Sequence, residues 1–148
     1  MKHKIRLMQS KDLLSVVALW KNTPGIGLDK DCDSIRGLKR YLRRNPRLSY
    51  IATVDSLIVG AVLSGHDGRR GYLHHLAVDP DYRKQGIANT LIQSCFKQLS
   101  RQHIPKCNIF LFKSNTSGRS FWIHNGWNLR PDLLLLQKMT NVCHCCHI

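Results

Sequence analysis

The residue types best suited to chemistry in this chain lie in a basic, glycine-containing bend at residues 83–88. The bend follows an apolar stretch that ends at Val78 and precedes an apolar periodicity that predicts a helix. Gly86 has no Cβ, so a ligand can approach its backbone closely, and the N–H groups that open a helix have no partners within it. These amides and the helix dipole are typical of a phosphate site, and Arg83 and Lys84 add positive charge at its rim. The bend therefore predicts that a pyrophosphate binds here.

The same six residues fit the R/Q-x-x-G-x-G/A signature of the GNAT acyltransferases, and the chain resembles that superfamily well beyond them. Residues 72–88 resemble its fourth strand and cofactor loop, and residues 115–127 resemble its N-x-x-A-x-x-[LF]-Y-x-x-x-G-F helix. Two matching blocks in the expected order are more specific than one short pattern. The resemblance implies an enzyme, an acetyl-CoA-dependent N-acetyltransferase that uses acetyl-CoA as co-substrate.

The resemblance also implies which residues hold the cofactor. In this family the backbone of the strand end pairs with the amide groups of the pantetheine arm, and the residue here numbered Val78 donates its N–H to the thioester oxygen. Asn115 matches a residue at the helix start that contacts the arm, and Trp122 would pack beside it. The predicted cofactor-binding residues are Leu76, Ala77, Val78, Arg83, Lys84, Gln85, Gly86, Ile87, Ala88, Asn115 and Trp122.

Acetyl transfer to an amine needs a base, because an alkyl amine with a pKa of about 10.4 is almost entirely protonated at pH 7. Alternation along the predicted strand puts Tyr72, His74 and Leu76 on one face and His75 on the other, unless a bulge intervenes. His74 is positioned like a strand histidine of the serotonin N-acetyltransferase branch, and an imidazole suits a base that acts directly or through water. We predict His74 as the base and His75 as the second candidate. The alternative is a His74 that only packs between sheet and helix.

The proton for the departing thiolate has no obvious donor. Members of the family commonly have a tyrosine where this chain has Trp122, and an indole N–H cannot act as an acid at neutral pH. Tyr72 or a water would supply the proton, or coenzyme A would leave as the thiolate. The predicted catalytic residues are therefore His74, His75 and Tyr72. The same departure leaves open a function of another class, a non-catalytic sensor module that binds acyl-CoA.

The elements that position these residues predict an α/β fold with a mixed, mostly antiparallel GNAT-type sheet flanked by helices. Either Asp33 or Ser34 can cap the second helix. We expect one N-acetyltransferase domain over residues 1–148, with a flexible tail at 143–148. Strands are predicted at 5–8, 48–54, 57–64, 72–78, 106–113 and 133–139. Helices are predicted after Ser10, after the cap at Asp33 or Ser34 as far as Pro46, from Gly86 and at 116–124.

The formal net charge of +14 exceeds what a phosphate-bearing ligand needs. We interpret a cluster of cations on and after the second helix as a solvated helix face, and the alternative is a patch for nucleic acid or an acidic protein. The expected partners are acetyl-CoA and an amine acceptor that the sequence does not name, with no nucleic acid and no membrane, in a monomer or homodimer. The clustered residues are Lys39, Arg40, Arg43, Arg44 and Arg47.

Six cysteines occur in the chain. We expect no signal peptide and a core large enough to fold without disulfides, so reduced thiols and a cytoplasmic location are predicted. The segment 143–147 carries soft ligands that zinc prefers, but their spacing is too tight to surround a tetrahedral ion, and we predict no metal site. No apolar run approaches the roughly 20 residues of a membrane span.

Overall fold

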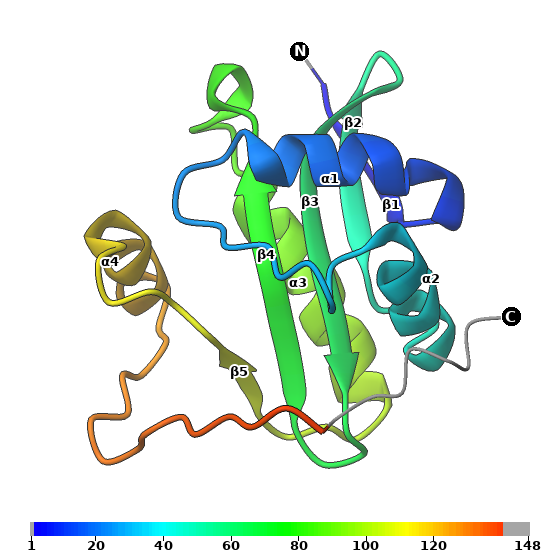
Figure 1. The fold of residues 1–148 in the computed structure, drawn as a ribbon. Coiled ribbons are helices and arrows are strands. Elements are labelled where there is room, and N and C mark those ends of the chain that lie inside the picture. Colours follow the sequence, from blue (N-terminus) through cyan, green and yellow to red (C-terminus); the bar gives the residue numbers. More distant parts are fainter. Residues whose placement is uncertain (1, 141–148) are drawn as a thin grey trace, which may run out of the picture. The chain divides into compact units, whose positions relative to one another are not determined.

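The computed structural model describes residues 2–140 of the chain (Figure 1). The chain packs as two compact units, Met1–Phe112 and Lys113–Ile148, and each is described by itself. The predicted flexible tail at 143–148 and the cysteines and histidines at 143–147 lie outside the described residues. The expectation of one domain over residues 1–148 therefore stays a prediction.

The first unit is built on one five-stranded sheet whose strands follow one another in chain order. Neighbours from β1 to β4 are antiparallel, and β5 runs parallel to β4. The two-residue turn between β2 and β3 uses Asp55 and Ser56, both with positive φ, as such hairpin turns require. This is the mixed, mostly antiparallel sheet that the sequence predicts. The strands are β1 (Lys4–Leu7), β2 (Tyr50–Val54), β3 (Leu57–His66), β4 (Gly71–Val78) and β5 (Cys107–Ile109).

Helices cover both faces of this sheet, with α1 and α2 in front of it in Figure 1 and α3 behind it. The apolar sides of α1 (Leu13–Lys21) and α2 (Ile35–Arg44) close one core, in which Trp20 is fully buried. On the other face α3 (Ile87–Arg101) packs so closely that a Cβ on Gly60 would lie 3.1 Å from the side chain of its first residue. The sheet is therefore covered on both faces, and only its edges remain open.

The start of α2 follows the predicted capping chemistry. Of the two candidate caps, Ser34 is the one used, because its Oγ accepts the N–H of Gly37 at 3.0 Å. The predicted basic cluster lies on the outside of α2 and just after it, where it takes no part in the ion pairs of the described residues. Exposure is common to a solvated helix face and to a patch for an acidic partner, so the interpretation stays a prediction. All of its members are exposed: Lys39, Arg40, Arg43, Arg44 and Arg47.

The described cysteines carry free thiols, and Cys95 is fully buried on α3. Burial raises the pKa of Cys95 to about 12, so this thiol stays protonated and packs as a small apolar side chain. Within residues 2–140, no group of three or more histidine, cysteine, aspartate or glutamate side chains could hold a metal ion. Over the same residues, no helix combines the length and the apolar character that crossing a bilayer requires.

The second unit contains α4 (Thr116–His124), with the bounds that the sequence predicts. Asn115 caps this helix, because its Oδ1 accepts the N–H of Gly118 at 2.9 Å. Trp122 is only 8% exposed, and its ring meets that of Trp127 edge-on with centroids 4.8 Å apart. Within its own unit, Trp122 is thus a packing residue.

Two predicted strands differ from the structure. The strand predicted at 133–139 is wrong, since these residues form no strand and the leucines at 133–136 are between 59% and 89% exposed. A strand needs a hydrogen-bonding neighbour, which a local apolar run cannot specify. The strand predicted at 106–113 is shorter than expected, because β5 pairs with β4 only as far as Ile109.

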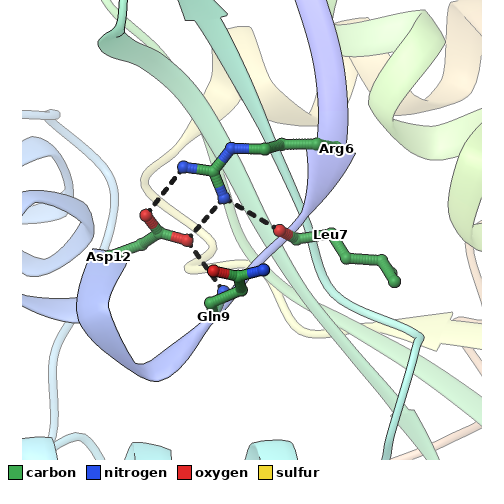
Figure 2. Close-up of polar contacts among 4 residues, drawn as sticks. All are labelled: Arg6, Leu7, Gln9 and Asp12. Atoms are coloured by element: carbon green, nitrogen blue, oxygen red, sulfur yellow. Dashed lines mark hydrogen bonds and ion pairs between the residues drawn. The ribbon is translucent and has the colours of Figure 1, made fainter.

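An ion pair fixes the junction between β1 and the first helical turn (Figure 2). Arg6 holds Asp12 through two hydrogen bonds of 2.8 Å, and Asp12 also accepts the N–H of Gln9 at 2.8 Å. Asp12 is only 5% exposed, so the guanidinium compensates the burial of its charge. Ser10, predicted as a helix cap, instead lies inside the short 3-10 turn η1 (Ser10–Asp12). Asp12 accepts the N–H of Gln9, the residue that precedes this turn.

The substitution Asp12→Asn should lower the free energy of unfolding at pH 7 by about 1–2 kcal/mol, a modest loss because Arg6 is partly solvated. The hydrogen bond from Arg6 holds the pKa of Asp12 below its ordinary value. Because this pKa is lower in the folded than in the unfolded state, the stabilisation is complete above about pH 4 and disappears as the pH falls through the folded value.

Denaturant unfolding at pH 7 and at about pH 2.5 measures this effect. The difference between wild type and Asp12→Asn should shrink at the lower pH. Asp81→Asn, which neutralises an exposed carboxylate, should change little at either pH. An equal loss for Asp12→Asn at both pH values would contradict the role of the ion pair.

Candidate active site

The edge of β4 is unpaired over its second half. β5 pairs with residues 71–73 only, whereas β4 continues to Val78, and no other described strand lies on that side (Figure 1). The Asp79 N–H donates to the Val59 carbonyl at 2.8 Å, toward β3, so by alternation the Val78 N–H faces the open edge. An extended ligand can add to such an edge as another strand would. The open end comprises the predicted residues Leu76, Ala77 and Val78.

A β-bulge interrupts β4 just before this open end. Ala61 of β3 pairs with Ala77, but Leu63 pairs with His74, so two residues of β4 stand opposite one residue of β3. His75 is one of the two and has φ of 56°, a left-handed conformation that is strained for a residue with a Cβ. Strict alternation along the strand is therefore wrong here. The bulge lets the adjacent histidines share one face, with ring centroids 6.1 Å apart.

Aromatic rings surround the first of these histidines. His74 stacks with Tyr72 and Phe110, both at centroid distances of 6.1 Å, and meets Tyr41 edge-on at 6.2 Å. Burial lowers the pKa of His74, and the neighbouring His75 lowers it further, so the imidazole is neutral at pH 7. It makes no hydrogen bond to another described residue. The ring contacts bring together the three predicted catalytic residues, Tyr72, His74 and His75.

The second histidine has a carboxylate partner that sequence reasoning did not assign to the site. His75 Nε2 lies 3.1 Å from Oδ1 of Asp33, which precedes α2, and both side chains are largely buried. The ring of Trp20 lies 4.9 Å from the imidazole. The sequence marked Asp33 only as a candidate cap. Because Ser34 caps the helix, the carboxylate of Asp33 is available to β4.

The bend at residues 83–88 has the geometry of an anion site. Lys84 and Gly86 adopt positive φ, and α3 begins after Gly86 without a side-chain cap. The first helical bond runs from the Thr90 N–H to the Gly86 carbonyl at 3.0 Å, so the N–H groups of residues 87–89 have no partner within the helix. A Cβ on Gly86 would meet nothing within 4 Å, so the surroundings of this residue at the start of α3 are open. These features fit a pyrophosphate.

Arg83 also contacts the end of the strand. After the 3-10 turn η2 (Pro80–Tyr82), its Nε donates to the carbonyl of Val78 at 3.2 Å. This bond ties the bend to the end of β4 and occupies the last carbonyl of the strand. The Val78 N–H is left as the polar backbone group at that position, which suits a donor to an oxygen.

The predicted site residues divide between the two units. Asn115 and Trp122 belong to the second unit, where one caps α4 and the other packs against Trp127. The first unit brings together the open edge of β4, the two histidines of the bulge and the start of α3. It contains all the other predicted residues: Tyr72, His74, His75, Leu76, Ala77, Val78, Arg83, Lys84, Gln85, Gly86, Ile87 and Ala88.

Comparison with known proteins decides what this site is. The model of the acetyltransferase (GNAT) family matches residues 15–127. The chain belongs to this family. An acetyltransferase of Yersinia pestis is 36% identical over an alignment of 119 residues, and the match covers 76% of this chain and 78% of the relative. An acetyltransferase of Sodalis glossinidius is 32% identical over an alignment of 142 residues, and the match covers 91% of this chain and 94% of the relative.

Solved structures share the fold of this GNAT chain. The PaiA N-acetyltransferase of Thermoplasma acidophilum, in complex with coenzyme A, is 23% identical with a TM-score of 0.76, over 88% of this chain and 92% of that one. An aminoglycoside acetyltransferase from an uncultured soil sample, in complex with sisomicin, is 17% identical with a TM-score of 0.71, over 93% and 95%.

These findings confirm the predicted family, the mixed α/β fold and the assignment as an acetyltransferase. Acetyl-CoA as co-substrate is confirmed with the family, whose activity is acetyl transfer from this thioester. The alternative of a non-catalytic sensor finds no support among the relatives, which are named acetyltransferases.

The substitution Gly86→Glu tests the bend as the pyrophosphate site. Its carboxylate would enter the space in front of the amides that open α3, so we expect the Kd for acetyl-CoA to rise at least about tenfold, or ~1.4 kcal/mol. The matched control is Gly68→Glu in the hairpin between β3 and β4. Both glycines have positive φ, 78° and 91°, and open space around the Cβ position, so the backbone strain is similar.

Isothermal titration of each variant with acetyl-CoA measures the two constants, and thermal unfolding checks that both lose a similar amount of stability. Gly68→Glu should bind within about twofold of wild type. If Gly86→Glu also binds like wild type, the bend does not hold the pyrophosphate.

Proposed function

We propose that this acetyltransferase moves the acetyl group of acetyl-CoA to a primary amine of a small molecule or a protein. The observation that carries the proposal is the position of the two histidines at the bulge, directly before the unpaired end of β4. A base and an edge that can hold an extended thioester arm would then lie within one segment of eight residues, Gly71–Val78. The amine needs such a base, because it is protonated at neutral pH.

Acetyl-CoA supplies an activated acyl group. The backbone of Leu76, Ala77 and Val78 is proposed to pair with the amides of its arm, and the Val78 N–H to donate to the carbonyl oxygen, where negative charge develops during transfer. His74 or His75 takes the proton of the amine. Tyr72 or a water protonates the departing sulfur, or coenzyme A leaves as the thiolate.

The remaining contacts to the cofactor are proposed from the bend and from α4. The open amides at the start of α3 support a role in holding the pyrophosphate, and the charge of Lys84 adds to it. In the second unit, Asn115 and Trp122 are proposed to contact the arm. The residues of the bend in this role are Arg83, Lys84, Gln85, Gly86, Ile87 and Ala88.

The loop at residues 23–28 is proposed to help choose the acceptor. It stands against the aromatic segment after β5, because a Cβ on Gly27 would overlap the ring of Phe112. Phe110 of the same segment stacks with Tyr72 and His74. The solved structures with a similar fold include an aminoglycoside acetyltransferase in complex with sisomicin. They also include a ribosomal-protein-S18-alanine N-acetyltransferase from Escherichia coli. A shared fold therefore does not select the acceptor.

We further propose that residues 1–148 form one N-acetyltransferase domain and that the protein acts in the cytoplasm as a monomer or homodimer. The family model supports one domain, because its match over residues 15–127 crosses the boundary between the two units. The free thiols of Cys32, Cys95 and Cys107 fit a reducing compartment. We propose that the exposed basic cluster is a solvated surface and that the protein binds no nucleic acid.

The release of coenzyme A thiol tests the proposed function. Purified protein with acetyl-CoA and a panel of small amines, polyamines, aminoglycosides and peptides should release thiol faster with at least one amine than without any. Mass spectrometry of the product should show one added acetyl group. Saturable binding of acetyl-CoA without amine-dependent release across the panel would reject transfer to an amine.

A further inference from the structure

The carboxylate of Asp33 is oriented by its own loop before it meets the strand. Its Oδ2 accepts the N–H of Asp29 at 2.8 Å, and its own N–H donates to the Asp29 carbonyl at 2.7 Å. The side chain of Asp29 in turn accepts the N–H groups of Asp31 and Cys32 at 2.8 and 2.9 Å. These hydrogen bonds within the loop fix the side chain of Asp33, and its other oxygen, Oδ1, contacts Nε2 of His75.

This contact joins residues that are 42 positions apart in the chain, and it falls on the strained residue of the bulge. The side chains are 18% exposed for His75 and 10% exposed for Asp33. A strained backbone conformation that the surrounding structure enforces is found at functional sites.

We propose that His75, rather than His74, takes the proton of the acceptor amine, and that Asp33 is the positioning residue that holds its ring. The inference rests on the proposed transfer to an amine. It adds Asp33 to the site and reverses the order of preference between the two histidines.

The hydrogen bond fixes which ring nitrogen is free. A carboxylate only accepts, so the neutral ring of His75 carries its proton on Nε2 and donates it to Asp33, and the lone pair lies on Nδ1. Nδ1 first takes one proton from the protonated amine, which leaves a neutral amine with a lone pair. This lone pair bonds to the acetyl carbon, the carbon–sulfur bond breaks with its electron pair on sulfur, and the second proton that the nitrogen loses passes to the sulfur through water or Tyr72. The imidazolium later returns its proton to solvent.

His74 is less suited to this role. Its ring is fixed by stacking and not by a polar partner, and burial and the neighbouring imidazole both disfavour its charged form. The groups that face His75 are Asp33 from the loop before α2, His74 on its own strand, and the Trp20 indole of α1, which does not titrate. Asp33 is thus the acidic group in direct contact with His75.

The substitution Asp33→Asn tests the inference because it reverses the hydrogen bond. The amide oxygen must still accept the N–H of Asp29, so the amide NH₂ faces Nε2 of His75 and donates to it. The ring proton is then driven to Nδ1, and the lone pair that should accept the amine proton is lost. The same inversion disables the triad of serine proteases.

We expect kcat of Asp33→Asn to fall about a hundredfold at pH 7, with the KM for acetyl-CoA changed less than about twofold. The loss should shrink toward pH 10, where more of the amine is neutral without a base. His75→Ala should lose about as much, and His74→Ala should lose less than about tenfold. Nitrogen NMR of the free protein should show the Nε2–H form of His75 in wild type and the Nδ1–H form in Asp33→Asn.

The matched control is Asp31→Asn, which removes the same charge from the same loop at an exposed carboxylate and should keep kcat within about twofold. Three results with an active wild type would overturn this inference but not the proposed function. They are an unchanged kcat in Asp33→Asn, an unchanged tautomer of His75 in that variant, and a larger loss of kcat in His74→Ala than in His75→Ala. If wild type releases no thiol with any amine, the proposed function fails as well. The NMR measurement needs no activity, so it still shows whether Asp33 sets the tautomer of His75.

Discussion

The unpaired end of β4 is the constraint on which the rest of the site depends. Backbone N–H and C=O groups need partners, and a strand that outlasts its neighbour exposes a row of them. Helices cover both faces of the sheet, so a ligand can reach this row only along the edge. Arg83 occupies the last carbonyl, that of Val78, and leaves the adjacent N–H available. The fold thus provides an incomplete sheet that an extended thioester arm can complete.

The sequence predicted those parts of the site that a few neighbouring residues decide. The helix α3 begins after Gly86, Ser34, one of the two candidate caps, caps α2, and α4 spans the predicted residues. In each case the chemistry is contained within about one helical turn, so a local pattern suffices. The family resemblance extended this local information to the order of strands.

The sequence could not predict what depends on pairing between distant segments. The bulge arises from the register between β3 and β4, and it places His75 on the same face as His74. The contact of His75 with Asp33 depends on both that bulge and the loop before α2. The run at 133–139 failed as a strand for a related reason, because apolar character gives a segment the tendency to pair but not a partner.

The left-handed backbone at residue 75 has a consequence for substitutions at this position. A glycine there would relieve roughly 1 kcal/mol of local strain, but it would also remove the imidazole that bonds to Asp33 and contacts Trp20. The strained conformation is therefore held by side-chain contacts that a glycine could not make.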